Sequence, residues 1–149
     1  MEAKELMVGD YVISTKRNLD EILKVVSIDG GTNICWLDGD SYSGCVAGED
    51  IKPIPLTEEL LENNGFKKIN CLSNPDSYFY RLTIVENYPD HTYNTWLLEV
   101  DNKQDDFVCD GDFQYDEILQ GEICNYKIKF VHELQQIMRK LKIKKDIKL

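Results

Sequence analysis

The segment IKPIPLTEELLENNGF, residues 51–66, constrains the fold most strongly, because it closes one structural unit and opens another. Pro53 and Pro55 have no backbone N–H to donate, and each pushes the residue before it toward an extended conformation. A run of short strands that precedes them should therefore stop there. We expect two units, residues 1–54 and residues 55–149.

A short helix should begin directly after the prolines. Thr57 can accept a hydrogen bond from an orphan amide of the first turn, and Glu58 and Glu59 lie at the positive end of the helix dipole. Gly65, which follows two asparagines, favours the left-handed turn that ends a helix, and Phe66 is placed to pack back on that helix. These features are structural and indicate no chemistry.

Five short runs with strand character precede the prolines, with glycine and aspartate turns between them. The runs are Val8–Ser14, Ile22–Ile28, residues 32–39, Tyr42–Val46 and Ile51–Ile54. Many short strands in about fifty residues are typical of a small barrel that closes its own edges. We expect an SH3-like small β-barrel over residues 1–54, a fold that names no function by itself.

The second unit should be an antiparallel sheet covered by one C-terminal helix, so the fold class is α+β. Four segments have strand character, and the first two form a hairpin: Tyr78–Glu86, Tyr93–Asp101, Phe107–Cys109 and Ile123–Lys129. The first alternates, with Tyr78, Tyr80, Leu82 and Ile84 on one face and Phe79, Thr83 and Val85 on the other. Apolar residues recur every three or four positions from Phe130 to Leu141, which predicts a helix that lies on this sheet. Ile147 and Leu149 are candidates for a terminal edge strand.

The cysteines indicate neither a disulfide framework nor a zinc site. There are five of them, at positions 35, 45, 71, 109 and 124, without a CxxC pair. We expect buried free thiols. A nucleophilic cysteine would need a histidine partner, and neither His91 nor His132 stands in a recognisable cysteine-protease context.

The acidic segment from Asp106 to Glu117 partly matches a calcium-binding loop. Val108 breaks the match at its third position, and the flanking segments have strand rather than helix character. A solvated acidic loop is the interpretation that we prefer, and the sequence alone does not settle whether the segment binds a cation.

No other pattern indicates catalysis. The carboxylate pairs Asp38 with Asp40 and Asp105 with Asp106 could share proton transfer, but they adjoin predicted turns, where aspartate is common. His132 lies beside the apolar stripe of its helix without a metal-ligand partner nearby, so we expect a histidine on the helix surface or half-buried. The sequence therefore predicts no catalytic, cofactor-binding or metal-binding residue and no cofactor.

Charge is unevenly distributed along the chain. There are 27 Asp and Glu against 17 Lys and Arg, but residues 1–138 carry a balance of −15 and residues 139–149, RKLKIKKDIKL, a balance of +5. An acidic body repels a polyanion, so a basic protein is a better partner than nucleic acid. Lysines near a helix end also complement its dipole, which explains the tail without a ligand.

Two further features bear on partners. The N-terminus has no apolar signal-peptide core, and the longest apolar run is Ile34–Leu37, so we expect neither secretion nor a membrane partner. The central hairpin is rich in aromatic residues, which either form an exposed interface or pack within the fold. They are Tyr78, Phe79, Tyr80, Tyr88, Tyr93 and Trp96.

Three motifs carry a resemblance: LMVGDYV at the start, IKPIPLTEELLENNGF in the middle and FVHELQQIMRKL near the end. Together they resemble a family of short uncharacterised proteins of gut-bacterial genomes, often associated with prophage or other mobile elements. The resemblance spans most of the chain. It implies a bacterial, cytoplasmic protein and no known activity.

Charge and resemblance together predict a non-catalytic acidic protein-interaction module, an adaptor or inhibitor of a mobile element. In one version its acidic face mimics the phosphate array of DNA. The alternative is a nucleic-acid-binding protein that uses the small barrel and the basic C-terminal tail. An enzyme with an unrecognised carboxylate site stays open, because a missing motif does not exclude activity. The oligomeric state is not predicted.

Overall fold

The computed structural model describes residues 1–16, 21–71, 74–87, 93–103, 106–115 and 118–149, with side chains described outside residues 72–77, 86–97, 102–106 and 108–125. Residue contacts divide the chain into two compact units. The first is Met1–Pro55 with Phe130–Ile137, and the second is Leu56–Lys129 with Met138–Leu149. The expected division into residues 1–54 and 55–149 stays a prediction about which parts fold independently.

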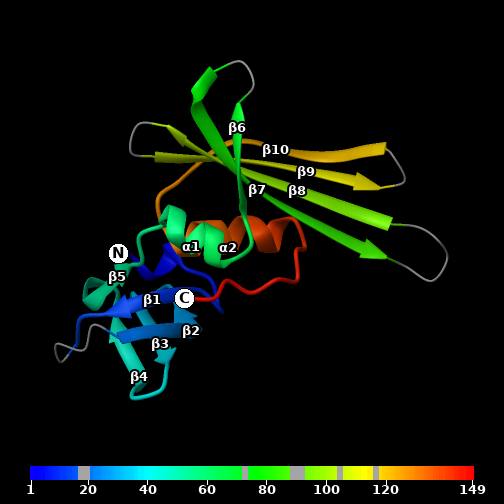
Figure 1. Cartoon of the computed structure of the whole chain (residues 1–149). Helices are drawn as coiled ribbons and strands as arrows, with labels where there is room; N and C mark the ends of the chain where they lie inside the picture. Colours follow the sequence, from blue (N-terminus) through cyan, green and yellow to red (C-terminus); the bar gives the residue numbers. More distant parts are fainter. Residues whose placement is uncertain (17–20, 72–73, 88–92, 104–105, 116–117) are drawn as a thin grey trace. The chain divides into compact units, whose positions relative to one another are not determined.

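The first unit is built on a five-stranded antiparallel sheet in the order β4-β3-β2-β1-β5 (Figure 1). Its strands are β1 (Tyr11–Ser14), β2 (Glu21–Asp29), β3 (Ile34–Asp38), β4 (Ser43–Ala47) and β5 (Ile51–Pro53). Two 3-10 turns accompany them, η1 (Ala3–Glu5) before β1 and η3 (Gly48–Asp50) between β4 and β5. The five expected strands are thus confirmed, with shifted ends.

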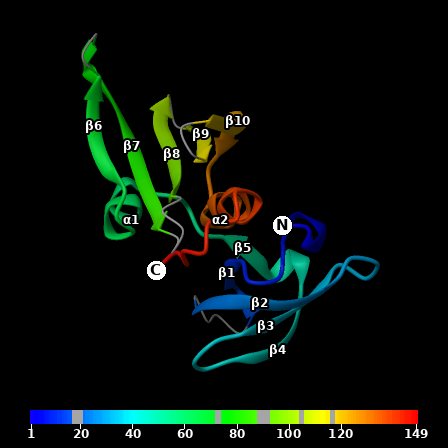
Figure 2. The ribbon, with the colours of Figure 1, turned by 90° about the vertical axis from the view of Figure 1, so that its right-hand side faces the viewer.

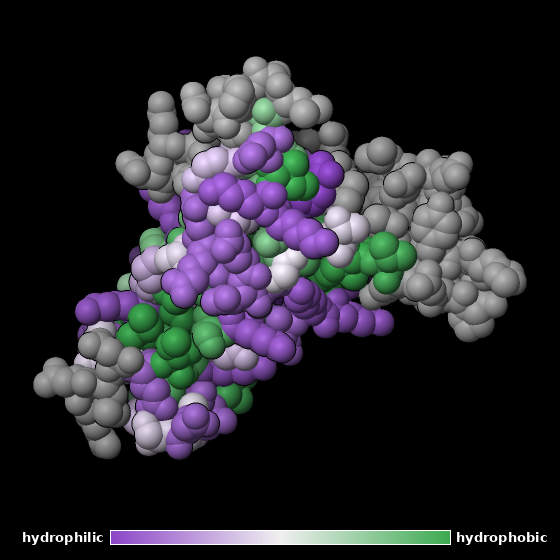
Figure 3. Space-filling model, viewed as in Figure 1, coloured by the Kyte–Doolittle hydropathy of each residue, from purple (hydrophilic) through white to green (hydrophobic). Residues whose placement is uncertain are grey.

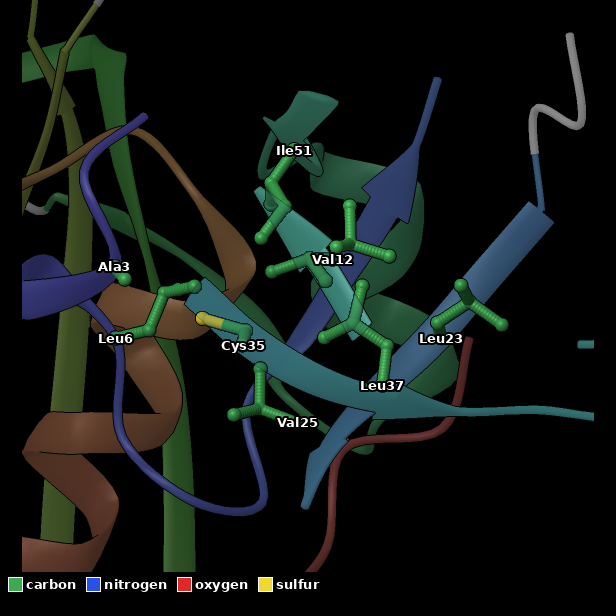
Figure 4. Close-up of a cluster of buried hydrophobic side chains, with 9 residues drawn as sticks. Ala3, Leu6, Val12, Leu23, Val25, Cys35, Leu37 and Ile51 are labelled. Carbon is green, nitrogen blue, oxygen red and sulfur yellow. The ribbon is translucent and has the colours of Figure 1, made fainter. Parts of the chain in front are cut away.

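Every strand of this sheet contributes to one hydrophobic core. Alternate residues of the strands point to the same side, and these are the buried ones (Figure 4). The core consists of Ala3, Leu6, Val12, Leu23, Val25, Cys35, Leu37, Val46 and Ile51. A single core shared by five strands requires the sheet to curl around it.

The expected closed barrel is not found. Among the residues that the structure describes, β4 and β5 are the two edges of the sheet and do not pair with each other. The chain between them forms the 3-10 turn η3, which is not extended, and β5 is short and ends on Pro53, which has no N–H for a ladder. The first sheet is therefore curled but open.

The helix α2 (Val131–Lys140) begins in the first unit. The Gln135 side chain accepts a hydrogen bond from the Tyr11 backbone N–H at 3.0 Å and donates one to the Gly9 carbonyl at 3.3 Å. A single amide side chain therefore pairs with the Tyr11 N–H and with the Gly9 carbonyl at the start of β1.

The next residue of α2 extends this contact. Gln136 donates to the Glu5 carbonyl and to the fully buried Asp10 carboxylate, both at 2.9 Å. Asp10 also accepts from the Met7 backbone N–H at 2.8 Å. We expected the whole helix Phe130–Leu141 to cover the second sheet, whereas its first part groups with the first unit. The two glutamines are polar, so an apolar stripe could not reveal this contact.

The second unit contains a second five-stranded antiparallel sheet, in the order β10-β9-β8-β7-β6 (Figures 1 and 2). Its strands are β6 (Lys67–Cys71), β7 (Asn74–Asn87), β8 (Tyr93–Lys103), β9 (Asp106–Tyr115) and β10 (Ile118–Ile128). The β7–β8 hairpin is confirmed. Along β7, Tyr80 and Leu82 are buried while Thr83 and Val85 are exposed, as the alternation predicts.

Three expectations about this unit were wrong. The strand β6 was missed because its sequence, KKINC, has little apolar alternation. Asp106–Tyr115, expected to be mostly an acidic loop, is the strand β9 and pairs with both β8 and β10. Residues 143–149 form no edge strand. In β9, pairing on both edges outweighs the turn preference of Asp and Gly.

The short helix α1 (Glu58–Asn63) is capped as expected and leads into β6 (Figure 2). The Thr57 hydroxyl accepts from the Leu60 backbone N–H at 3.2 Å. Gly65 has a φ of +82°, and the Phe66 N–H returns to the Leu61 carbonyl at 3.0 Å. This pairing ends the helix with its last carbonyls satisfied.

The basic tail is fastened to the end of α1. The buried Asn64 side chain donates to the Lys148 carbonyl at 2.8 Å and accepts from the Lys148 N–H at 2.7 Å. The Lys145 ammonium donates to the Asn64 carbonyl at 2.6 Å. Ile143 and Ile147 are buried. None of the helices formed by the described residues is long and apolar enough to span a membrane.

Candidate functional site

The outer surface of the first sheet carries large apolar side chains that its own unit does not cover. Trp36 is 45% exposed, Val26 47% and Ile34 37%, and Ile22 is exposed as well. We call these four residues the Trp36 face. Figure 3 shows hydrophobic residues gathered on the surface of this unit, over β1 and β2, among hydrophilic neighbours.

Strand alternation explains why these residues point outward. In β3, Cys35 and Leu37 enter the core, so Ile34 and Trp36 must lie on the opposite side of the sheet. In β2, a bulge between Val25 and Ser27 inserts one extra residue opposite Trp36. Val26 is that residue, and the bulge leaves it exposed beside the tryptophan.

Charged residues border the Trp36 face. Asp29 is the cross-strand partner of Ile34, and Asp38 is the partner of Lys24 at the other end of β3. The Lys24 ammonium lies 5.6 Å from the centre of the Tyr11 ring, a cation–π contact. Asp38 is exposed, and Asp40, which follows it in the β3–β4 turn, is exposed as well, so both carboxylates are open to a partner.

The cysteines differ from one another in exposure. Cys35 is buried in the first core, and burial raises the pKa of its thiol. Cys45 stands opposite Trp36 in the β3–β4 ladder and is exposed, and Cys71 is half-buried. The expectation of buried free thiols is therefore confirmed for Cys35 and wrong for Cys45, while the side chains at positions 109 and 124 lie outside the described residues.

A second polar arrangement lies in the second unit, between α1 and the sheet. The Glu58 carboxylate accepts hydrogen bonds from two tyrosine hydroxyls, Tyr78 at 2.6 Å and Tyr80 at 2.8 Å. The two rings stand edge to face, with centres 6.0 Å apart and planes 88° apart. The Lys68 ammonium lies 3.5 Å from the centre of the Tyr78 ring and 3.8 Å from the Glu58 carboxylate.

The surroundings of the Tyr80 hydroxyl determine its pKa. Burial raises the pKa of Tyr80, and the hydrogen bond to Glu58 and the charge of that carboxylate raise it further. Tyr80 thus remains a neutral donor to the Glu58 carboxylate. The arrangement places a carboxylate, two tyrosine hydroxyls and an ammonium group close together.

The cluster also answers part of the question about the hairpin aromatics. Tyr80 is fully buried, and Tyr78 and Phe79 are half-buried, so these three pack within the second unit. The side chains of Tyr88, Tyr93 and Trp96 lie outside the described residues.

The comparisons with protein-family models, curated proteins and solved structures found no match. The functional interpretation therefore has to come from the residues themselves. Two arrangements stand out among the described residues: the Trp36 face and the Tyr78–Glu58–Lys68 cluster.

The other sequence candidates do not form a site in the part of the chain that the structure describes. Asp38 and Asp40 are exposed at the β3–β4 turn, and the side chains of Asp105 and Asp106 are not described. The described backbone of Asp106–Tyr115 is strand, which is not the turn that wraps a calcium ion. Among the described residues, no three histidine, cysteine or acidic side chains lie close enough together to hold a metal ion.

His132 is buried near the start of α2, where its ring is stacked on that of Phe130 with centres 5.8 Å apart and planes 11° apart. The prediction of a half-buried or surface histidine understated its burial. This environment is a packed aromatic one.

Sequence reasoning missed both arrangements. The alternation of ICWL could have revealed the Trp36 face, because it places Trp36 opposite to Cys35 and Leu37. The Tyr–Glu–Lys cluster gives a weaker signal, since its residues come from three elements. Only the spacing of Tyr78 and Tyr80 on one face of β7 was visible.

Proposed function

We propose that this protein is a non-catalytic acidic interaction module that binds a basic protein segment through the Trp36 face. The observation that carries the proposal is the exposed Trp36 beside Val26 and Ile34, bordered by Asp29 and Asp38. Tryptophan is enriched among residues that dominate binding energy, and neighbouring apolar groups that exclude water strengthen such contacts. Exposed apolar side chains grouped within a polar border are a common mark of interaction surfaces.

Charge complementarity supports the choice of a basic partner. The chain has a formal net charge of −10, and the excess of acids lies in its body. Lys24 belongs to the border of the face but packs over Tyr11. A basic segment would meet exposed carboxylates at Asp38 and Asp40, and its association would be rapid and salt-dependent.

The finer structural and cellular assignments belong to the same proposal. We assign residues 1–54 to the SH3-like class of small barrels, in a form that stays open between β4 and β5. The order β4-β3-β2-β1-β5 and one core shared by all five strands support this assignment. The setting is a bacterial cytoplasm and a mobile element, in which the protein acts as an adaptor or an inhibitor. That setting follows from the family resemblance of the sequence motifs alone.

Nucleic-acid binding by the barrel and the basic tail has less support. The Lys145 ammonium donates to the Asn64 carbonyl, and Lys140 donates to the Tyr126 hydroxyl at 3.3 Å. Two of the tail's cations thus make contacts within the second unit. Lys142, Lys144 and Lys148 are exposed, and they are the residues through which this alternative would act.

The test combines capture with matched variants. Tagged wild-type protein is incubated with nuclease-treated lysate of the producing bacterium at low and high salt, and mass spectrometry identifies partners. Each partner is then purified and titrated against the wild type, Trp36→Thr, the double variant Asp38→Asn/Asp40→Asn and the control Val85→Thr. Val85 is 53% exposed on the second sheet, outside the Trp36 face.

The proposal predicts a basic partner whose affinity falls at least about tenfold with Trp36→Thr and more modestly with the double variant. Val85→Thr should bind like the wild type. A partner that binds Trp36→Thr as tightly as the wild type would refute the Trp36 face. A parallel capture omits the nuclease. Recovery of nucleic acid alone in that capture, lost when residues 139–149 are deleted, would favour the alternative function.

A further inference from the structure

The cluster of Glu58, Tyr78 and Tyr80 has the components of an ammonium-binding site. Two tyrosine rings stand edge to face, and a carboxylate between their hydroxyls supplies a negative charge. An alkylammonium group prefers such surroundings, because the face of an aromatic ring and a carboxylate both attract a cation. All three residues belong to the second unit, so the inference does not depend on the Trp36 face.

The site already holds a cation of the chain itself. Lys68 is the cross-strand partner of Tyr80 in the β6–β7 ladder, which brings its side chain to the same side of the sheet. Its ammonium lies 3.5 Å from the centre of the Tyr78 ring, 5.7 Å from that of Tyr80 and 3.8 Å from the Glu58 carboxylate. Lys68 therefore occupies the position that a bound ammonium group would take.

Hydrogen bonds and burial fix the positions of Glu58 and the two tyrosines, in contrast to an ordinary surface ion pair. Tyr80 is fully buried, and each oxygen of Glu58 accepts from a different tyrosine hydroxyl. None of these contacts involves Lys68. Lys68, in contrast, is held by its ion pair and the ring faces, and its side chain is 42% exposed.

We propose that Glu58, Tyr78 and Tyr80 form a binding site for an alkylammonium group, which Lys68 fills in the free protein and which a lysine or methylated lysine side chain of a partner takes over. The exposure of Lys68 and Glu58 gives the incoming group a path from solvent. Exchange of one ammonium for another keeps the local charge constant, so the half-buried Glu58 carboxylate keeps a cationic partner throughout.

The first test uses Lys68→Ala. The probes are tetramethylammonium and a short peptide with one trimethyllysine, and binding is followed by the NMR signals of the Tyr78 ring. Lys68→Ala should bind both probes at least about tenfold more tightly than the wild type, since its site is vacant. Lys67→Ala serves as the matched control, because Lys67 is exposed and its cross-strand neighbour in β7 is Arg81 and not Tyr80.

Two further variants make the result specific. Adding Tyr78→Leu to Lys68→Ala should abolish binding, because the ring that contacts the cation is gone. Lys68→Met keeps most of the side-chain volume without the charge and should bind neither probe. Binding of tetramethylammonium without the peptide would support the ammonium site but would refute a lysine side chain as its occupant. Failure of Lys68→Ala to bind either probe would overturn the proposal.

A measurement on the wild type covers the case in which Lys68→Ala does not fold. Protons on the ε carbon of Lys68 should be shifted upfield by the ring current of Tyr78, and the shift should disappear in Tyr78→Leu. Lysine signals at ordinary positions in the wild type would show that the site is not filled by Lys68 and would refute the inference.

Discussion

The side chain of Asn64 binds the backbone of Lys148 through both its oxygen and its nitrogen, at 2.7 and 2.8 Å. This is how one strand of a sheet binds another, with an amide side chain in place of one backbone. The same residue ends α1, since its N–H donates to the Leu60 carbonyl at 3.1 Å. One buried amide thus serves as the end of a helix and as the anchor of the basic tail.

Asn64→Ala should lower the free energy of unfolding by about 2 kcal/mol, because the buried amide is lost and the part-buried backbone groups of Lys148 lose their partners. Urea denaturation measures the loss. Trypsin should also cleave after Lys145 faster than in the wild type, since the tail is released. The neighbouring exposed Asn63 supplies the control: Asn63→Ala should change neither quantity, and equal effects of the two variants would show that the anchor is unimportant.

Thr57→Ala should cost about 1 kcal/mol, because the cap of α1 loses its hydroxyl acceptor. Thr57→Ser keeps that oxygen and should retain most of the stability. Thermal unfolding of the three proteins is sufficient to compare them. If serine is as destabilising as alanine, the methyl group rather than the hydroxyl is what matters at this position.

Tyr80→Phe should lower stability at neutral pH by about 1 kcal/mol, because Glu58 loses one of its donors. It should also change the alkaline limb of the stability profile. The pKa of Tyr80 is raised in the folded state, so the folded state retains this proton while the unfolded chain releases it above about pH 10. The contribution of Tyr80 is therefore complete below that pH and is lost as the pH rises further.

Urea unfolding between pH 8 and pH 11 measures this difference, and Tyr80→Phe should show a shallower decline than the wild type. Tyr42→Phe is the matched control, since the Tyr42 hydroxyl makes a more exposed hydrogen bond to the Cys45 carbonyl at 3.2 Å. Parallel declines in the wild type and Tyr80→Phe would contradict the coupling between Tyr80 and folding.

Cys45 should react with a small alkylating reagent much faster than Cys35 in the folded protein. Cys45 is exposed, whereas Cys35 lies in the core and burial raises the pKa of its thiol, which lowers the fraction of reactive thiolate. Peptide mass spectrometry after short labelling times gives both rates. In concentrated urea the two rates should converge, and a fast Cys35 in the native protein would show that the first core is open.

Local rules predicted α1 and the alternation of β7. Thr57 and Gly65 marked the two ends of α1, and alternation placed Tyr80 and Leu82 on one face of β7, opposite Thr83 and Val85. Each of these signals lies within a few residues, where capping and side-chain periodicity act. The five strands before Pro53 were recognisable for the same reason.

Features that depend on distant residues were missed. Asn64 and Lys148 are 84 residues apart, and Gln135 and Tyr11 are 124 apart, so no local pattern connects them. In β9, hydrogen bonding to two neighbouring strands overrides a composition that favours turns. Of the candidate sites, alternation could have exposed Trp36, but the meeting of Glu58 with two tyrosines requires the fold.

The contacts of Gln135 and Gln136 have a consequence for how this chain can be divided. The first unit resumes at Phe130, after the whole second sheet, and Phe130 forms a bridge with Pro55. Because Pro55 and Phe130 are bridged, residues 56–129 connect two neighbouring positions of the first unit, as a hairpin loop would. A gene in which a few glycines replace residues 56–129 would encode the first unit with its glutamines in place, whereas truncation at residue 55 removes them.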